Sequence, residues 1–218
     1  MPSSQFERAA QARGYEIVCG VDEVGRGPWA GPVYACALVL DCARIESDGL
    51  QGLDDSKKLN ALQREALYAR LIEQAQIGIG MCSVDEIDRL NILQASLLAM
   101  KRAVAALPVR PHYALIDGNK TPPLAVPCET IVAGDATCYS IAAASIVAKV
   151  TRDRVMVELA QSFPGYGWHT NMGYGTKEHQ AGLARLGVTI HHRKSFAPIR
   201  NRLNEARSDP RDVASADS

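Results

Sequence analysis

The sequence lacks the features that mark secreted, zinc-binding and membrane proteins. Its six cysteines form no CxxC pair, which argues against a disulfide framework or a zinc site and favours reduced thiols. No apolar run reaches the length of a membrane span, and the first residues lack the charged-then-apolar pattern of a secretory signal. We therefore expect a cytoplasmic protein that has no membrane partner.

The chain also lacks net charge, because 24 Lys and Arg balance 24 Asp and Glu. The charges are unevenly placed, however. Residues 149–203 carry nine basic against three acidic side chains, and residues 1–148 carry 13 against 17. An acidic first part and a basic later part indicate a carboxylate-lined centre beside a surface for polyanions. An ordinary pattern of solvated charges is the alternative.

The length and composition fit one globular domain. The 218 residues are 47% hydrophobic and 22% charged, which is enough apolar material to fill a core. We expect a single domain over residues 1–203, helical from about residue 160, and a monomer. The polar residues 204–218 are expected to form a disordered tail.

Hydrophobic periodicity predicts strands first and then alternating helices and strands. The expected strands are 16–24 and 33–41, joined as a hairpin, then 76–82, 112–116 and 124–132. The expected helices are 60–74, 83–107, 137–161, 176–186 and 197–206. This order predicts an α/β fold with a mixed central sheet and a more helical C-terminal part.

Acidic residues follow apolar segments, beside glycine, at three places in the chain. They are Asp22 and Glu23 in VDEVG, Asp117 in LIDGN and Asp135 in VAGDAT. Functional groups of open α/β sheets gather at strand ends and adjoining loops. Carboxylates that converge there need a counter-charge, and hard divalent cations supply it. Two such cations activate a water and stabilise the leaving oxygen in phosphodiester hydrolysis.

Each of these acids also has a plain structural interpretation. Asp135 is a candidate N-cap of the long helix, and Asp117 a turn former before Gly118. The adjacent pair Asp22 and Glu23 is harder to explain in this way. If the strand continued, at least one of the two carboxylates would enter the core.

The glycines at positions 25, 27 and 31 superficially resemble a dinucleotide-binding loop. Such a loop is followed by a helix, whereas Pro28 and Pro32 intervene here and the next segment, VYACALVL, is β-like. The same glycines can present backbone N–H groups to a sugar or a phosphate. A nucleotide-cofactor oxidoreductase and a non-catalytic nucleic-acid-binding domain remain the competing interpretations.

Six stretches of the chain, in order, resemble one family. The stretches are GVDEVGRGPWAGPV, LDDSKKL, LIDGNK, AGDATCYSIAAASIVAKVTRD, GYGTKEH and HRKSFAP. Together they resemble bacterial type 2 ribonucleases H (ribonuclease HII). The resemblance covers nearly everything from Gly20 to Pro198.

The resemblance implies a ribonuclease H-like fold and a two-ion Mg²⁺ or Mn²⁺ site. Asp22, Glu23, Asp117 and Asp135 would be both its catalytic residues and its metal ligands. It further implies an endoribonuclease that cuts the RNA strand of RNA/DNA hybrids and cuts 5′ of single ribonucleotides in duplex DNA. The products would carry a 3′-hydroxyl and a 5′-phosphate, and the role would be ribonucleotide removal during replication and repair.

The resemblance also assigns substrate contacts. The backbone of Gly25, Arg26 and Gly27 would approach the ribose 2′-hydroxyl, and Tyr174 would sit at the RNA–DNA junction. Phosphate contacts are expected from a set of polar and basic residues, each of which alone is more often a solvated surface group. The set is Ser56, Lys57, Lys58, Lys149, Lys177, Arg193 and Lys194.

Two residues depart from the family pattern. Trp29 stands where a smaller aliphatic residue is expected, and Met172 where lysine is common, which puts a phosphate contact in doubt. The run His191-His192-Arg193 allows a metal cluster, although a phosphate or structural role fits adjacent histidines better. Tyr166 and Trp168 are expected to pack their glycine-rich loop onto the fold rather than stack on bases.

Overall fold

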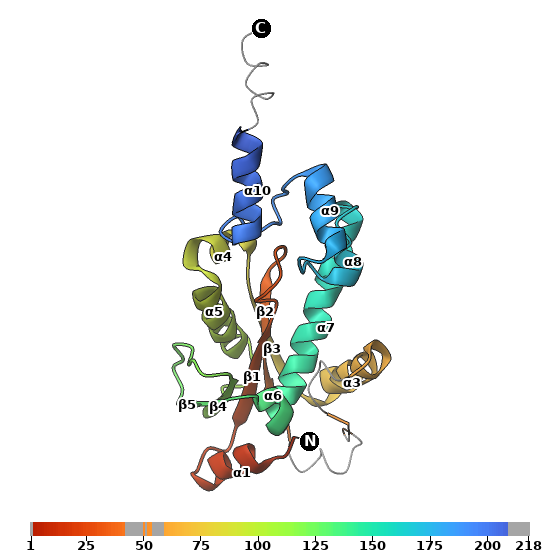
Figure 1. Ribbon diagram of the computed structural model, residues 1–218. Helices are drawn as coiled ribbons and strands as arrows, with labels where there is room; N and C mark the ends of the chain where they lie inside the picture. The colour runs from red at the N-terminus through yellow and green to blue at the C-terminus, as the bar shows by residue number, and fades with distance from the viewer. Residues whose placement is uncertain (1, 42–49, 51, 54–58, 209–218) are drawn as a thin grey trace.

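A computed structural model describes residues 2–41, 50, 52–53 and 59–208, and these residues contain a five-stranded sheet in the order β3-β2-β1-β4-β5 (Figure 1). The strands are β1 (Val18–Val24), β2 (Val33–Val39), β3 (Gln76–Cys82), β4 (Tyr113–Asp117) and β5 (Cys128–Ile131). β1, β2 and β3 pair antiparallel, whereas β4 is parallel to β1 and β5 is parallel to β4. The predicted hairpin and the predicted mixed sheet are therefore confirmed.

Helices cover both faces of the sheet. α7 (Tyr139–Ser162) and α3 (Ala61–Gln74) lie on one face, and α5 (Ile92–Ala105) lies on the other (Figure 1). Alternate residues of β2 divide between two cores, with Cys36 and Leu38 packed toward α7 and α3, and Ala35 and Ala37 packed toward α5. This alternation follows from the two-residue period of a strand.

Glycine allows both covering helices to lie directly on the strands. A Cβ atom at Gly20 of β1 would overlap the backbone of Ser140 in α7. A Cβ atom at Gly80 of β3 would overlap the carbonyl oxygen of Ala99 in α5. The small-residue stripe of the long helix serves the same close packing, because Ala142, Ala143 and other residues of this stripe are fully buried.

The helix expected over residues 83–107 is in fact two helices. α4 (Val84–Leu90) begins with the predicted capping box, in which Ser83 and Glu86 exchange side-chain to backbone hydrogen bonds. The chain then turns at Asn91, whose φ is 68°, and the Asn91 side chain caps α5. Because its ψ is 162°, Asn91 leaves the helical conformation altogether, and its side chain accepts from the N–H of Gln94 to start the new helix.

The N-terminal helix α1 (Gln5–Ala12) was not predicted. Its Glu7 is 2% exposed and accepts a hydrogen bond of 2.8 Å from the backbone N–H of Ser140, at the start of α7. A carboxylate at this position satisfies a free N–H group of the helix and interacts favourably with the helix dipole. The sequence alone gave no partner for Glu7, because Ser140 lies 133 residues away.

The C-terminal part is helical, as expected. A short helix, α8 (Trp168–Asn171), lies inside the segment expected to be loop, and α9 (Lys177–Leu186) ends at Gly187 as predicted. The last helix, α10 (Ala197–Ser208), runs past residue 203, so residues 204–208 are helical and not part of a disordered tail. Residues 209–218 lie outside the described residues.

Two findings concern the part of the chain that the structure describes. Its five cysteines are free thiols. None of its helices is both long and apolar enough to cross a membrane.

Candidate active site

The four predicted acids lie at one edge of the sheet. Asp22 and Glu23 stand near the end of β1, and Asp117 ends the neighbouring parallel strand β4. Val21 pairs with Ile116 in the register, so the two strands bring these acids side by side. Asp135 lies in α6 (Gly134–Thr137), which follows β5, and is therefore not the N-cap of the long helix.

A strained turn brings Asp135 to Asp117. Ala133 has a φ of 54°, a conformation that costs roughly 1–2 kcal/mol for a residue with a Cβ. Oδ1 of Asp117 accepts hydrogen bonds from the backbone N–H of Gly134 at 2.8 Å and of Asp135 at 3.4 Å. These bonds hold the turn and fix the start of α6 against the end of β4.

Crowding of buried negative charge defines the electrostatics of this edge. Asp22 is 6% exposed, and its burial raises the pKa of its carboxyl well above the ordinary value, with Glu23 and Asp117 adding to the effect. The Ser145 hydroxyl donates to Asp22 and partly opposes the shift. Burial likewise raises the pKa of Glu23, against the opposing effect of Arg26 at 3.2 Å.

The donor set fits a hard divalent cation in its chemistry. It consists of carboxylate oxygens that repel one another, which is what Mg²⁺ and Mn²⁺ neutralise. As the side chains stand, no three His, Cys, Asp or Glu groups within the described residues are arranged to hold a metal ion. Glu23 pairs with Arg26 through one of its two carboxylate oxygens.

A cavity of about 260 Å³ opens beside the carboxylates. Glu23, Arg26 and Asp117 line one side of it. Asn119 and Lys120, directly after Asp117 and Gly118, line it as well. Sequence reasoning missed Lys120 as a candidate cation of the site, although its spacing from Asp117 in the LIDGNK stretch was a usable signal.

The loop formed by Gly25, Arg26 and Gly27, here called the 25–27 loop, lies against Tyr174. A Cβ atom at Gly27 would be 3.2 Å from Cε1 of the tyrosine, and Tyr174 is 47% exposed. Gly25 has a φ of 93°, and a Cβ there would overlap the guanidinium of Arg152. The loop that the family resemblance assigned to the ribose and the tyrosine that it assigned to the junction are therefore neighbours.

Arg193 does not contact phosphate in the way predicted. Its side chain is fully buried and donates to the carbonyl oxygens of Gly25 at 2.6 Å, Arg26 at 3.0 Å and Gly31 at 2.9 Å. Burial lowers its pKa to about 9. The prediction of a surface phosphate contact is wrong, because the forked donors of the guanidinium are used up on backbone oxygens.

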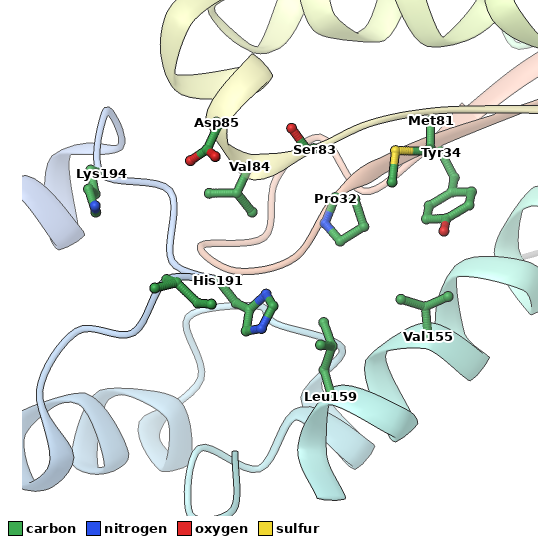
Figure 2. A pocket seen from close by; sticks show the side chains of 11 residues that line it. Pro32, Tyr34, Met81, Ser83, Val84, Asp85, Val155, Leu159, His191 and Lys194 are labelled. Atoms are coloured by element: carbon green, nitrogen blue, oxygen red, sulfur yellow. The ribbon is translucent and has the colours of Figure 1, made fainter. Parts of the chain in front are cut away.

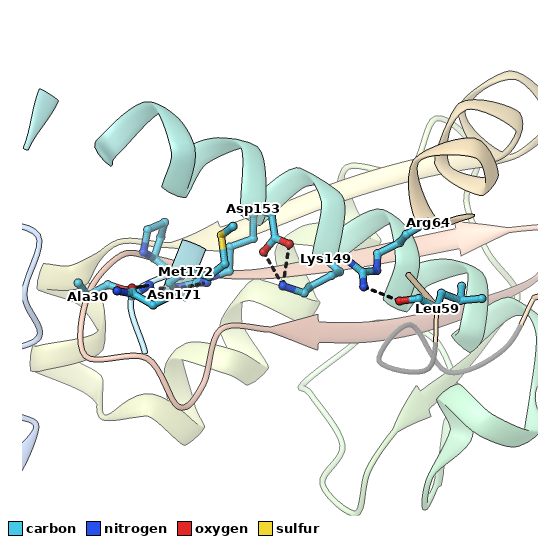
Figure 3. A network of polar contacts seen from close by, with 10 residues as sticks. Ala30, Leu59, Arg64, Lys149, Asp153, Asn171 and Met172 are labelled. Atoms are coloured by element: carbon cyan, nitrogen blue, oxygen red, sulfur yellow. Dashed lines mark hydrogen bonds and ion pairs between the residues drawn. The ribbon is translucent and has the colours of Figure 1, made fainter. Parts of the chain in front are cut away.

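Lys149 is ion-paired within the protein. Its Nζ lies 2.6 Å and 2.7 Å from the two carboxylate oxygens of Asp153, one helical turn along α7 (Figure 3). Of the other expected phosphate contacts, Lys177 and Lys194 are exposed. Ser56, Lys57 and Lys58 lie outside the described residues.

The aromatic residues of the glycine-rich loop pack the fold, as predicted. Tyr166 and Trp168 are buried and stack with ring centroids 4.9 Å apart. Trp29, the first departure from the family pattern, lies against Gly175, where a Cβ would overlap its indole ring. Met172, the second departure, has a φ of 50° and its carbonyl accepts a 2.9 Å hydrogen bond from Arg152.

A larger cavity of about 510 Å³ lies away from the acids. Its lining includes apolar side chains, among them Pro32 just before β2, Met81 from β3, Val84 from α4 and Leu159 from α7, and also polar ones such as Asp85 and Lys194 (Figure 2). None of the four acids lines this cavity. Its size therefore does not identify it as the site of the chemistry, which needs the carboxylates.

Known proteins resemble this chain in sequence and in fold. The family model "Ribonuclease HII" matches residues 19–199. Ribonuclease HII of Cereibacter sphaeroides (strain ATCC 17029 / ATH 2.4.9) is 58% identical over 95% of this chain and 96% of its own length. Ribonuclease HII of Parvibaculum lavamentivorans (strain DS-1) is 53% identical over 98% of this chain and 77% of its own length.

Solved structures agree with these relatives. Ribonuclease H2 from Pyrococcus horikoshii OT3 superposes with a TM-score of 0.75 at 27% identity, over 88% of this chain and all of that one. Bst-RNase HIII, solved in complex with Mn²⁺, shares the fold with a TM-score of 0.69 at 20% identity, over 91% of this chain and 73% of that one. The mixed sheet with flanking helices is thus a ribonuclease H-like fold. The chain belongs to the ribonuclease HII family and is a type 2 ribonuclease H, an endoribonuclease.

Proposed function

We propose that this protein hydrolyses the RNA strand of RNA/DNA hybrids and nicks duplex DNA on the 5′ side of single embedded ribonucleotides. The products carry a 3′-hydroxyl and a 5′-phosphate, and the reaction serves ribonucleotide removal during replication and repair. One observation carries this proposal: four acids gather at one sheet edge, and the glycine loop that directly follows two of them lies against an exposed tyrosine.

Asp22, Glu23, Asp117 and Asp135 would hold two Mg²⁺ or Mn²⁺ ions. Two bound cations of this kind supply an activated water and charge stabilisation for the leaving oxygen. Three of these side chains have partners within the protein that hold them at the sheet edge. Backbone N–H groups orient Asp117, and the Ser145 hydroxyl orients Asp22. Arg26 holds Glu23 at the rim of the 260 Å³ cavity, where substrate has room to enter.

The choice of cleavage site needs groups that sense the 2′-hydroxyl, because this group distinguishes RNA from DNA. The 25–27 loop offers backbone N–H groups that a glycine lets approach closely. Tyr174 offers a half-exposed ring and a phenol hydroxyl directly beside Gly27. We assign the ribose contact to the loop and the junction contact, by stacking on the following deoxyribose, to the tyrosine.

Phosphate contacts come from exposed cations around this site. Lys177 begins α9 close to Tyr174 in the chain, and Lys194 follows the buried Arg193. Lys120 is added to the set because it lines the cavity at the carboxylates. Lys149 would contribute only after leaving Asp153, so we expect its replacement to matter less than that of Lys177.

A nicking assay tests the proposed function. Three labelled duplexes are compared in Mg²⁺ and in Mn²⁺: one embedded ribonucleotide, a continuous RNA strand opposite DNA, and DNA alone. Cleavage of the first two with metal present, and not of the third, is expected. A protein that binds these duplexes without cutting them in either metal would instead be a nucleic-acid-binding domain. Asp117→Asn serves as the inactive control.

A further inference from the structure

Two adjacent buried residues, His192 and Arg193, connect the two parts of the site that sense the ribonucleotide. Both side chains are fully buried. Their backbone pairs with residues 29–31, which follow the 25–27 loop. The N–H of Arg193 donates to the carbonyl of Trp29 at 2.8 Å, and the N–H of Gly31 donates to the carbonyl of His191 at 2.9 Å. From this position the two side chains extend to different parts of the site.

Arg193 holds the 25–27 loop. Its guanidinium donates to the carbonyl oxygens of Gly25 and Arg26, and also to those of Gly31 and Pro32 on the other side of the turn. Burying a charge is costly unless hydrogen bonds compensate it, and here every nitrogen of the guanidinium has a carbonyl acceptor. A guanidinium with this many backbone acceptors fixes the path of the loop at several points.

His192 holds Tyr174 through a second histidine. Nε2 of His192 lies 3.1 Å from Nε2 of His179, and Nδ1 of His179 lies 3.0 Å from the carbonyl oxygen of Tyr174. The partners assign the protons. A carbonyl only accepts, so Nδ1 of His179 donates to Tyr174. The N–H of Thr189 only donates, so Nδ1 of His192 accepts at 3.0 Å and its Nε2 donates to His179.

The two histidine side chains of this hydrogen-bond chain are buried. The lone pair on Nε2 of His179 is shared between His192 and Nε1 of Trp168, which donates at 3.1 Å, so rotation of the ring would lose both partners. Burial lowers the pKa of both histidines, which keeps them in the neutral form that the assigned protons require. The Tyr174 backbone is thus tied to the same dipeptide that ties the 25–27 loop.

We propose that His192 and Arg193 are positioning residues that set the spacing between the 25–27 loop and the Tyr174 ring. The inference rests on the proposed function of these two elements. Among the described residues, no hydrogen bond joins either side chain to the four acids, and the nearest link to the cavity beside them is the carbonyl of Arg26, to which Arg193 donates. The positioning role is therefore read from the nicking rate, and the state of the carboxylate site is measured separately.

A double-mutant cycle on the single-ribonucleotide duplex tests the proposal. Arg193→Lys keeps the charge and loses the forked donors, and it is expected to slow nicking by about tenfold or more. In the Tyr174→Ala background the same change is expected to slow nicking by less than about threefold. The distance between the 25–27 loop and residue 174 no longer matters there, because the tyrosine ring is absent. Arg110→Lys, an exposed arginine before the opposite end of β4, is the matched control.

A second pair of variants keeps the test decisive if Arg193→Lys folds poorly. His192→Gln places an amide N–H near the lost Nε2 and is expected to retain most activity, whereas His192→Leu is expected to behave like Arg193→Lys. For each variant the metal-induced rise in melting temperature reports an intact carboxylate site.

The results of these assays distinguish the junction role of Tyr174 from the positioning role of His192 and Arg193. If Tyr174→Ala alone nicks at the parent rate, the proposed junction role of the tyrosine is wrong and the inference fails with it. If Tyr174→Ala is impaired but Arg193→Lys slows nicking by the same factor with or without the tyrosine, only the positioning role is overturned. Full activity of both Arg193→Lys and His192→Leu would overturn it as well.

Discussion

The ring of Tyr174 rests on Gly27, with its Cε1 atom 3.2 Å from the point where a Cβ would stand on that glycine. Tyr174 lies just after the end of α8 and Gly27 just after the end of β1, so the two residues are 147 positions apart in the sequence. Because Gly27 has no side chain, the ring can lie against the loop, and Tyr174 as a whole stays about half exposed.

The first prediction concerns this tyrosine. Tyr174→Ala is expected to cripple nicking at a single embedded ribonucleotide, because the stacking surface at the junction is lost. Tyr174→Phe keeps the ring and loses one hydrogen bond to a neutral group, about 1 kcal/mol, so it is expected to slow nicking about fivefold to tenfold. Rates measured at saturating enzyme decide this, and equal rates for Ala and parent contradict it.

The second prediction concerns the acids. Asp117→Asn keeps the oxygen that accepts from Gly134 and removes the negative charge. Loss of nicking by more than about a hundredfold is expected, with an unchanged circular dichroism spectrum. Retention of near-normal nicking by the purified variant would remove Asp117 from the proposed metal ligands.

The third prediction concerns stability without metal. The pKa of Asp22 is raised by burial, so its ionised form is disfavoured in the folded state and stability is lost as pH rises above the unfolded value. At pH 7 without divalent metal, Asp22→Asn should therefore melt higher, by roughly 2–4 °C for each kcal/mol of penalty removed. Thermal melts in a chelator measure this, and a lower melting temperature than the parent opposes it.

The fourth prediction concerns metal binding. A cation that binds the folded acids and not the unfolded chain stabilises by about 2.7 kcal/mol at 100 times its dissociation constant, or about 5–10 °C in melting temperature. Mg²⁺ and Mn²⁺ are each expected to raise the melting temperature of the parent and to have little effect on Asp117→Asn. K⁺ at matched ionic strength is the control. An equal rise in parent and variant would place the binding elsewhere.

The fifth prediction concerns pH and the buried histidine pair. Burial lowers the pKa of His192 to about 3, whereas the unfolded value is near 6.5. Below pH 6.5 the unfolded chain binds a proton that the folded chain does not, so His192 removes about 1.4 kcal/mol of stability per pH unit as pH falls. The melting temperature of His192→Gln should thus fall less steeply than that of the parent between pH 7 and 5. Parallel curves for the two proteins would show that His192 stays as basic in the fold as in water.

Local sequence determined the elements that carry the chemistry. The acids Asp22, Glu23 and Asp117 each follow apolar strand residues and precede a glycine. A strand that ends in charged residues can be predicted from the residues next to it in the chain. The capping box at Ser83 and Glu86, and the stop of α9 at Gly187, were likewise predictable because capping depends on residues three or four apart.

Only the tertiary structure decided what Arg193 does. Arg193 was expected to be a surface contact for phosphate. Its partner Gly25 is 168 residues away, so the residues near Arg193 in the chain do not indicate that it is buried among carbonyl oxygens. Lys149 is a contrasting case: it was expected to contact phosphate, and the Asp153 that pairs with it lies four residues on in the same predicted helix, so this pair was within reach of local sequence. A strand or a cap is fixed by neighbours in the chain, whereas the burial of a long charged side chain depends on which distant backbone the fold brings to it.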